Sequence, residues 1–477
     1  VLYRKNACTS TVQRLCCINC RIASHICIYS KNQYHMIGDS MPAKTAVRSK
    51  KSGVEGSSKN GKQRKKNETQ DIPVAATIEE LHKILEDAGE ASVTNETFWQ
   101  TVRAQFPLKS EVLYLNNGTI GILPHLVLQS QIDVISQSEI DPWSPMPRRW
   151  PSPNEARQKT ADLLNCSPSE LAYTRNSTES MNIIAMGLNL NPEDEILTTT
   201  HEHHGGWSCW QNRHDQLGNP LRKIDLHDPP EDEDAILEIF KQAIRPETKV
   251  LSLCHVTCTT VWRLPVKKIC QMARKQGIIT VVDGAQSVGL IGVDLKDMGC
   301  DFFASSTHKW LFTPKGTGIL YIHEDAEDKI SGGYHAYRGK GSSLSAARFE
   351  NHASQSPAPY VGFGVAVDFH NAIGTTLIED RGATMAEYVK KGLSEIPGVK
   401  VLTPMSRKLS ASMISLSISG MTSNDLGQPL RRRYNIDTRG LHEGAYHGVR
   451  VSCAMHNTYE ELDTLIKAIG EIAENRV

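Results

Sequence analysis

The stretch Thr280-Val-Val-Asp-Gly-Ala-Gln286 is followed further along the chain by Ser306-Thr-His-Lys-Trp310. The first stretch ends a β-branched run at Asp283, which is typical of a buried strand meeting its turn. In open α/β sheets, ligands bind at the carboxyl ends of such strands. Lys309 is the second feature, because a lysine in a protein interior is costly unless it is paired or neutralised. Forming an imine with an aldehyde is one way to neutralise it.

Pyridoxal phosphate (PLP) is a cofactor that needs this pair of residues. An acid such as Asp283 protonates the pyridine nitrogen and makes the ring an electron sink, while a lysine such as Lys309 holds the aldehyde as a Schiff base and later moves protons. Taken alone, Asp283 is more often a turn or capping residue, and Lys309 is more often an exposed loop residue. The interpretation therefore depends on further segments.

Three groups of polar residues have the chemistry to hold the rest of such a cofactor. Ser177 and Thr178 stand where a helix begins, and the free N–H groups of a helix start bind anions such as phosphate. Ser306 and His308 flank the lysine and can donate to the same phosphate. His203, in His201-Glu-His-His204, follows a strand and can stack a flat ring on the pyridine. A metal site is disfavoured there, because adjacent residues of an extended chain point apart.

Arg450 is the candidate for binding a substrate carboxylate. The alternating stretch Gly448-Val-Arg-Val-Ser-Cys453 predicts a strand with Arg450 on one face and Val449 and Val451 on the other. A guanidinium can grip a carboxylate through two hydrogen bonds. Alone, Arg450 would also fit a surface salt bridge.

The pattern along the chain predicts a parallel sheet. Strands are expected at 196–200, 250–253 and 278–282, with a helix at Val266–Lys275 between the last two. Strand, helix and strand within about 35 residues form a βαβ unit. A later strand is expected at 316–322, and an amphipathic helix at 77–88. After about residue 375 the pattern changes to a smaller α+β region, whose last helix opens with the capping box Thr458-Tyr-Glu-Glu461.

The chain has 477 residues, too many for one ordinary core, so two domains with tails are expected. We expect residues 1–75 to be a disordered or targeting extension, because the segment 44–66 is rich in Lys, Arg, Gly and Ser. Residues 76–110 predict an N-terminal helical segment, 111–375 a large PLP-binding domain, and 376–477 a small C-terminal domain.

Composition narrows the partners and the location. Lys+Arg and Asp+Glu both number 53, so nothing global indicates nucleic acid or a membrane surface. No run of about 18 apolar residues predicts a spanning helix. Twelve scattered cysteines make no disulfide framework, which favours the cytoplasm, or an organelle if 1–75 includes a presequence. No metal is expected, since Cys17-x-x-Cys20 lacks a second well-spaced pair.

Together and in this order, the motifs resemble the class V aminotransferase family of fold type I PLP enzymes, which includes cysteine desulfurases and isopenicillin N epimerase-like proteins. The resemblance covers about residues 110–470. It implies an α/β PLP-transferase fold, with a mainly parallel sheet of the seven-stranded type in the large domain and a smaller α+β C-terminal domain. It also implies a homodimer with active sites at the subunit interface.

The resemblance assigns a role to each candidate residue. Lys309 forms the imine, Asp283 pairs with the ring nitrogen, Gln286 contacts the ring hydroxyl, and His203 stacks on the ring. The phosphate falls to Ser177, Thr178, Ser306 and His308, and the substrate carboxylate to Arg450. We therefore expect Lys309, His203 and Asp283 to be the catalytic residues.

The sequence departs from the family pattern in three places. The stretch Arg348-Phe-Glu-Asn-His-Ala-Ser354 lacks the Gly-Thr pair that often supplies a phosphate contact from the neighbouring subunit, although Ser354 could substitute. Val261 stands where similar sequences usually carry Gly. The segment 436–449 contains no Cys, whereas desulfurases carry a nucleophilic Cys on the corresponding loop.

The expected activity is that of a PLP-dependent enzyme that deprotonates the Cα atom of an amino acid. Reprotonation at the cofactor carbon gives transamination, and loss of a β-substituent gives a lyase. Reprotonation on the opposite Cα face gives epimerisation and requires a second acid, for which His442, Tyr446 and His447 are candidates. An aminotransferase-like or isopenicillin N epimerase-like enzyme is favoured. The alternatives are a cysteine or cysteine-conjugate C–S lyase and a non-catalytic PLP-binding protein.

Overall fold

The structure is a computed structural model of the chain, and it describes residues 72–109, 111–142, 149–226, 231–333, 345–443 and 446–474. The predicted extension 1–75 lies outside these residues except for its last four positions. No single described helix is long and apolar enough to cross a membrane, although α10 (Ala358–Ile373) and α11 (Thr375–Ser394), which are bent by 73°, pass the same length and composition test as a pair.

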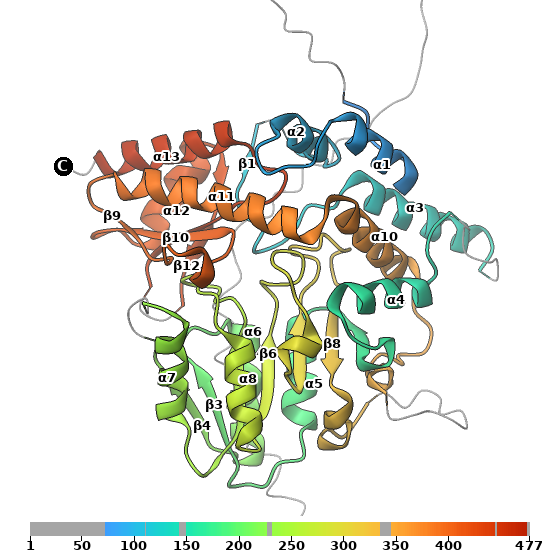
Figure 1. Ribbon diagram of the computed structural model, residues 1–477, viewed down its shortest axis with the longest axis vertical. Coiled ribbons are helices and arrows are strands. Elements are labelled where there is room, and N and C mark those ends of the chain that lie inside the picture. Colours follow the sequence, from blue (N-terminus) through green and yellow to red (C-terminus); the bar gives the residue numbers. More distant parts are fainter. Residues whose placement is uncertain are drawn as a thin grey trace, which may run out of the picture. The chain divides into compact units, whose positions relative to one another are not determined.

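A seven-stranded sheet is the centre of the large part of the structure (Figure 1). Its strands are β2 (Leu171–Thr174), β3 (Glu195–Thr199), β4 (Leu221–Ile224), β5 (Thr248–Cys254), β6 (Ile279–Asp283), β7 (Phe302–Ser305) and β8 (Gly318–Ile322). They lie in the order β2-β8-β7-β6-β5-β3-β4. The pairings from β7 to β4 are parallel, and β8 is antiparallel to both of its neighbours. This confirms the predicted α/β fold with a mainly parallel seven-stranded sheet.

The strands are apolar on both faces because helices cover both faces of the sheet. On β6, Val281 packs into one core cluster and the next residue, Val282, packs into the other. Helices α5 (Ser177–Gly187) and α6 (His204–Leu217) contribute to the first cluster. Helices α7 (Glu233–Ala243) and α8 (Val266–Lys275) contribute to the second, and Figure 1 shows them on the near face of the sheet. Asp283, at the carboxyl end of β6, is buried as a result.

The predicted βαβ unit is β5-α8-β6, and β5 and β6 pair in parallel. Helix α8 has the predicted bounds, because Pro265 precedes it and Gly277, at a φ of 66°, follows its end. The strand predicted at 316–322 begins only at Gly318. Gly316 adopts a φ of 80°, which a turn uses and a strand does not.

A second sheet of four antiparallel strands lies in the C-terminal part. Its strands are β9 (Val399–Val401), β10 (Met413–Ile418), β12 (Arg439–Leu441) and β13 (Gly448–Ser452), in the order β12-β13-β10-β9. Helices α11, α12 (Ser423–Arg433) and α13 (Tyr459–Glu474) share a core cluster with it. The predicted strand at 448–453 and the predicted capping box before α13 are confirmed, since Thr458 and Glu461 exchange both capping hydrogen bonds at 3.3 Å.

The first described residues contact the core of the large sheet through α1 (Ile78–Asp87) and α2 (Glu96–Ala104) and the C-terminal part through β1 (Leu113–Tyr114). Helix α1 is the predicted amphipathic helix, with Thr77 as its cap. The remaining described helices are α3 (His125–Ile140), α4 (Pro153–Leu164) and α9 (Leu295–Met298). Strand β1 pairs in parallel with β11 (Ile436–Asp437). The division of the chain at residues 75, 110 and 375 stays a prediction.

Candidate active site

Lys309 and Asp283 come from neighbouring strands. Asp283 ends β6, and Lys309 lies in the turn after β7, which pairs with β6. Burial raises the pKa of the Asp283 carboxyl group, while the Ala285 N–H at 2.9 Å and the charge of Lys309 oppose the shift. Burial lowers the pKa of Lys309 to about 8, although Asp283 opposes it. At a pKa of about 8, roughly a tenth of this amine is neutral at pH 7, far more than for an ordinary lysine, so it can act as a nucleophile toward a carbonyl group.

The turn at residues 116–118 holds the lysine segment in place. Asn117 donates its side-chain N–H to the carbonyl oxygen of Lys309 at 3.1 Å. Gln286 donates to the carbonyl oxygen of Gly118 at 2.8 Å and accepts the indole N–H of Trp310 at 2.8 Å. The side chain of Gln286, which is buried, is therefore fixed beside Lys309 by two residues far apart in the sequence.

His203 caps the start of α6 and carries a neutral ring. Its Nδ1 atom accepts the N–H of Gly205 at 3.0 Å, and its side chain keeps an exposed face. Partial burial of the ring, followed by the positive charges of Lys309 and Arg439, lowers its pKa to about 4. The imidazole is therefore uncharged at neutral pH and available to lie against a flat ligand.

Glu202 is a second buried carboxyl group, which the sequence analysis missed. Its Oε1 atom accepts the Thr199 hydroxyl at 2.7 Å and the Cys254 N–H at 3.2 Å. Burial, with a further contribution from Asp283, raises its pKa to about 7. A Cβ atom at Gly206 would lie 2.9 Å from Asp283 Oδ2 and 3.7 Å from Glu202 Oε2, so both groups face the same glycine. The sequence signal for this buried acid was the position of Glu202 between His201 and His203, just past a predicted strand.

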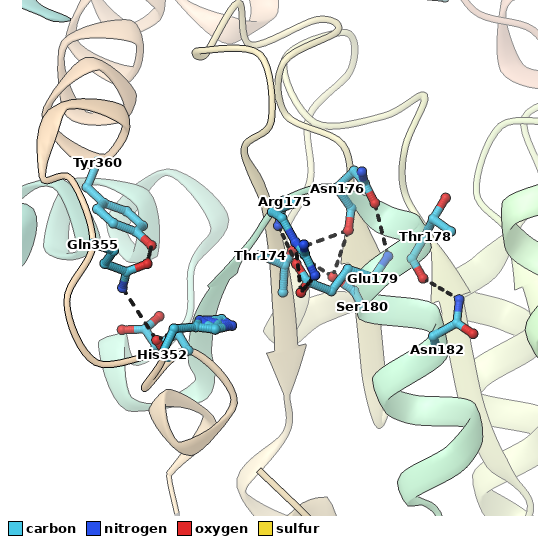
Figure 2. A network of polar contacts seen from close by, with 11 residues as sticks. Thr174, Arg175, Asn176, Thr178, Glu179, Ser180, Asn182, His352, Gln355 and Tyr360 are labelled. Atoms are coloured by element: carbon cyan, nitrogen blue, oxygen red, sulfur yellow. Dashed lines mark hydrogen bonds and ion pairs between the residues drawn. The ribbon is translucent and has the colours of Figure 1, made fainter. Parts of the chain in front are cut away.

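Two of the predicted phosphate ligands meet at the start of α5. The N–H of Ser177 donates to Ser306 Oγ at 2.9 Å, and the Ser306 hydroxyl donates back to Ser177 Oγ at 2.9 Å. Figure 2 shows Thr178 on the same first turn, which Asn176 caps. A Cβ atom at Gly205 would lie 2.4 Å from Thr178 Oγ1, so the starts of α5 and α6 touch here. Hydroxyls and a helix start together form an anion-binding arrangement.

His308 and the segment 348–354 make contacts within the chain. His308 Nδ1 lies 3.0 Å from the Thr317 carbonyl oxygen, and burial lowers the pKa of the ring. Glu350 pairs with Arg157 and accepts the N–H of Tyr173 at 2.6 Å, so this segment supports β2. The phosphate roles of His308 and Ser354 stay predictions.

Arg450 lies almost completely buried in the middle of β13, with 1% of its surface exposed. Its Nη1 atom donates to the Cys258 carbonyl oxygen at 3.0 Å, and its Nη2 atom to the Thr119 hydroxyl at 3.4 Å. Burial, then the charge of Arg439, lowers its pKa to about 10, so the guanidinium stays charged at neutral pH. Its Nε atom has no hydrogen-bond partner among the described residues.

Arg439 is a second guanidinium that the sequence analysis did not find. It stands opposite Arg450 in the β12–β13 pairing and forms an ion pair with Glu443. Its Nη1 atom is buried and has no acceptor among the residues that the structure describes. Arg439 pairs with Glu443, whose charge also acts on Arg450, and each guanidinium keeps a buried N–H with no acceptor among the described residues. That arrangement suits a substrate carboxylate.

The segment after β5 contains a buried cysteine, Cys258, and one of the sequence departures, Val261. Burial raises the pKa of the Cys258 thiol to about 11, so it is protonated at neutral pH despite the nearby arginines. Val261 is fully buried and has a φ of 60°, a conformation that strains a β-branched residue and that Gly adopts freely. The backbone therefore explains why similar sequences carry Gly at this position.

The three candidate second acids differ in their surroundings. His442 and His447 are exposed, whereas Tyr446 is half-buried. The Tyr446 hydroxyl lies 2.8 Å from Nε2 of His201, a residue that is 1% exposed. Of these three candidates, Tyr446 is the one that bonds a residue just past the end of β3, His201.

The donor set matches the functional groups of PLP. An amine lies near a buried carboxyl group, hydroxyls meet at a helix start, and a cationic pair lies near the same amine. Gly205 and Gly206 keep space that a Cβ atom would fill between these groups. Within the described residues, no group of three or more His, Cys, Asp or Glu side chains could hold a metal ion.

Comparisons with known proteins show the family to which the chain is similar. The family model described as aminotransferase class V matches residues 152–465. Isopenicillin N epimerase of Streptomyces clavuligerus is 29% identical over 390 residues, which cover 78% of this chain and 98% of the relative. The enzyme of the same name from Amycolatopsis lactamdurans is 30% identical over 397 residues, with 79% and 99% covered. An apo structure of a cysteine desulfurase from Thermococcus onnurineus NA1 is 25% identical, has a TM-score of 0.67, and covers 78% of this chain and 98% of its own.

Proposed function

The chain belongs to the class V aminotransferase family, and from this premise we propose that it is a PLP-dependent enzyme acting on an amino acid, with isopenicillin N epimerase-like chemistry favoured. One observation carries the proposal. The amine of Lys309, with a pKa lowered to about 8, interacts with the buried carboxyl group of Asp283 and with the buried guanidinium of Arg450. The amine for a cofactor aldehyde, the acid for a ring nitrogen and the cation for a substrate carboxylate are therefore close enough to interact.

Each end of the cofactor has protein groups to hold it. The hydroxyls of Ser177, Thr178 and Ser306, with the N-terminus of α5, would hold the phosphate, and Asp283 would pair with the ring nitrogen. When bound, PLP supplies an electron sink that makes the Cα–H bond of an attached amino acid acidic. His203, uncharged at neutral pH, would supply a flat apolar face against the ring.

The substrate is held by its carboxylate and loses a proton to the lysine. Arg450 and Arg439 bind the carboxylate, which orients the Cα–H bond toward Lys309. The Nζ atom of Lys309 removes the Cα proton, a role for which an amine with a pKa of about 8 suits neutral pH. Glu443 keeps Arg439 in position through their ion pair.

Elimination of a sulfur leaving group is the second candidate. The fold likeness to a cysteine desulfurase gives it some support. Against persulfide formation, the segment 436–449 contains no Cys, and the nearby Cys258 thiol is buried and protonated. A PLP-binding protein without turnover is the least favoured alternative, because lysine, acid and arginine residues with catalytic chemistry meet at one place.

We propose further that the enzyme is a homodimer, because the fold type I resemblance implies active sites at a subunit interface. A cytoplasmic location follows from the scattered cysteines, all free among those described, with an organelle as the alternative. Neither proposal depends on the reaction type.

The test is to mix the purified PLP-loaded protein with a panel of amino acids, to follow the absorbance of the cofactor, and to identify the products. Conversion between the L and D centres of one amino acid supports the epimerase proposal. Release of sulfide or pyruvate from cysteine-type substrates would replace it with the lyase. A protein that changed no amino acid in a broad panel would contradict the assignment as an enzyme.

A further inference from the structure

A chain of hydrogen bonds runs from the loop before β13 to the surface beside β4. The Tyr446 hydroxyl lies 2.8 Å from His201 Nε2, and His201 Nδ1 lies 3.4 Å from the Thr200 hydroxyl. The Thr200 hydroxyl donates in turn to Asp225 Oδ1 at 3.0 Å. His201 is 1% exposed, whereas Asp225 is exposed. Buried and exposed groups are thus joined in one sequence of proton donors and acceptors.

The direction of these bonds indicates which ring nitrogen of His201 carries a hydrogen. Because Thr200 donates its only hydroxyl hydrogen to Asp225, its oxygen is left to accept a hydrogen from His201 Nδ1. In the neutral form of the ring, Nε2 is then bare and accepts the hydrogen of Tyr446. Trp262 packs against His201, with ring centroids 5.1 Å apart, and keeps the imidazole in place. Tyr446 is therefore linked to a base that can take its proton and return it.

Lys309 and His201, the partner of Tyr446, lie on opposite sides of Asp283 in the order of the sheet. In the sheet order β7-β6-β5-β3, Lys309 follows β7 and His201 follows β3, while Asp283 ends β6 between them. Glu443, three residues before Tyr446, also reaches the site. The backbone N–H of Tyr446 donates to the Glu443 carbonyl oxygen at 3.3 Å, and the charge of Glu443 acts on both His203 and Arg450.

We propose that Tyr446 is the second proton-transferring residue, acting on the face of the substrate Cα atom opposite Lys309, with His201 and Thr200 linking its hydroxyl to solvent at Asp225. The inference rests on the proposed function and deepens it, because a second acid is what separates an epimerase from an aminotransferase. Tyr446 is the catalytic residue in this scheme, and His201 is a positioning residue that acts through it.

The proton balance closes in both directions. In one, Lys309 Nζ takes the Cα proton on its side, Tyr446 O–H gives a proton to the other side, and the electron pair of the broken Cα–H bond returns to Cα in the new one. The phenolate oxygen then regains a proton through His201. In the reverse direction, Tyr446 takes the Cα proton as it passes its own to His201 Nε2, and the ammonium form of Lys309 supplies the new Cα proton.

Glycine tests this scheme, because its two α-hydrogens differ only in the face they occupy. The PLP-loaded protein is incubated with glycine in D₂O, and the exchange of each prochiral hydrogen is followed by NMR. We expect the wild type to exchange both hydrogens. Tyr446→Phe should exchange the Lys309-side hydrogen at the wild-type rate and the other about 100-fold more slowly. His201→Phe, which keeps the ring contact with Trp262, should slow the same hydrogen.

Matched variants separate this role from a structural one. Tyr434→Phe removes a hydroxyl that bonds Glu471 of α13 at 2.6 Å in a half-buried contact, and it should leave both exchange rates unchanged. A Tyr446→Phe protein that exchanged both hydrogens at the wild-type rate would overturn the inference, as would a wild type that exchanged only one. A wild type that exchanged neither would instead overturn the proposed function, and this inference with it.

A second readout needs no turnover. In the ¹⁵N NMR spectrum of histidine-labelled protein without cofactor, Tyr446→Phe should shift the Nε2 signal of His201, because the ring loses its donor, whereas Tyr434→Phe should not. An Nε2 signal of His201 that is identical in wild type and Tyr446→Phe would show that the hydrogen bond is absent and would overturn the scheme.

Discussion

Replacing Glu202 with Gln changes one atom in the buried core behind the candidate cofactor site. The amide oxygen of Gln can still accept the Thr199 hydroxyl and the Cys254 N–H, which now bond Glu202 at 2.7 and 3.2 Å. What the change removes is an ionisable group whose pKa burial raises from 4.5 to about 7, with Asp283 adding to the effect. The substitution therefore isolates the electrostatic cost of this carboxyl group.

The magnitude follows from the pKa shift. In the unfolded chain Glu202 loses its proton near pH 4.5, whereas in the folded protein it keeps the proton until about pH 7. The folded state thus binds more protons between these values, so its stability falls as pH rises through this window and is constant above it. At about 1.4 kcal/mol per unit, the full cost above neutral pH is about 3 kcal/mol. Glu202→Gln should remove this cost.

The assay is urea unfolding of the cofactor-free protein at steps between about pH 5 and pH 8. The stability difference between Glu202→Gln and wild type should grow by about 2.5 kcal/mol across that range, in favour of the variant, because part of the window lies below pH 5. Glu193→Gln is the control, because Glu193 is an exposed residue shortly before β3. A difference that stayed constant with pH would refute the reasoning, since it would mean that Glu202 titrates alike in the folded and unfolded states.

Three further substitutions test the site itself. Lys309→Ala should lower turnover about 1,000-fold or more, because no other amine replaces it, and steady-state rates would show it; a variant with normal rates would remove the assignment. Arg450→Met should raise KM for the amino acid about 100-fold through loss of charge-assisted hydrogen bonds, with less effect on PLP binding; an unchanged KM would place the carboxylate elsewhere. Gly206→Ala should weaken PLP binding in a fluorescence titration, because the added Cβ would lie 2.9 Å from Asp283 Oδ2; wild-type affinity would show that this space is not used.

Local sequence signals predicted the elements that carry them. Helix α8 was predicted with its observed bounds, because Ile269, Met272 and Ala273 lie on one face between Pro265 and Gly277. Strand β6 was predicted within a residue from its β-branched run. Helix α10 gives no such signal, because most of its residues are buried and its apolar pattern has no polar side.

The same contrast holds for the candidate site. Lys309 and Asp283 were found because each stands at the end of a recognisable strand or motif. Arg439 was missed because it contributes to the site only through the pairing of β12 with β13, opposite Arg450. The contact between His201 and Tyr446 joins residues 245 positions apart, and no local pattern in either segment indicates it.

The most direct test of the account is the site at which PLP attaches. The protein loaded with PLP is treated with borohydride, which makes the attachment permanent, and is then digested and analysed by mass spectrometry. The account predicts that the added mass lies on the peptide containing Lys309 and on that side chain. A modification on another lysine, or protein that binds PLP without any such modification, would contradict it.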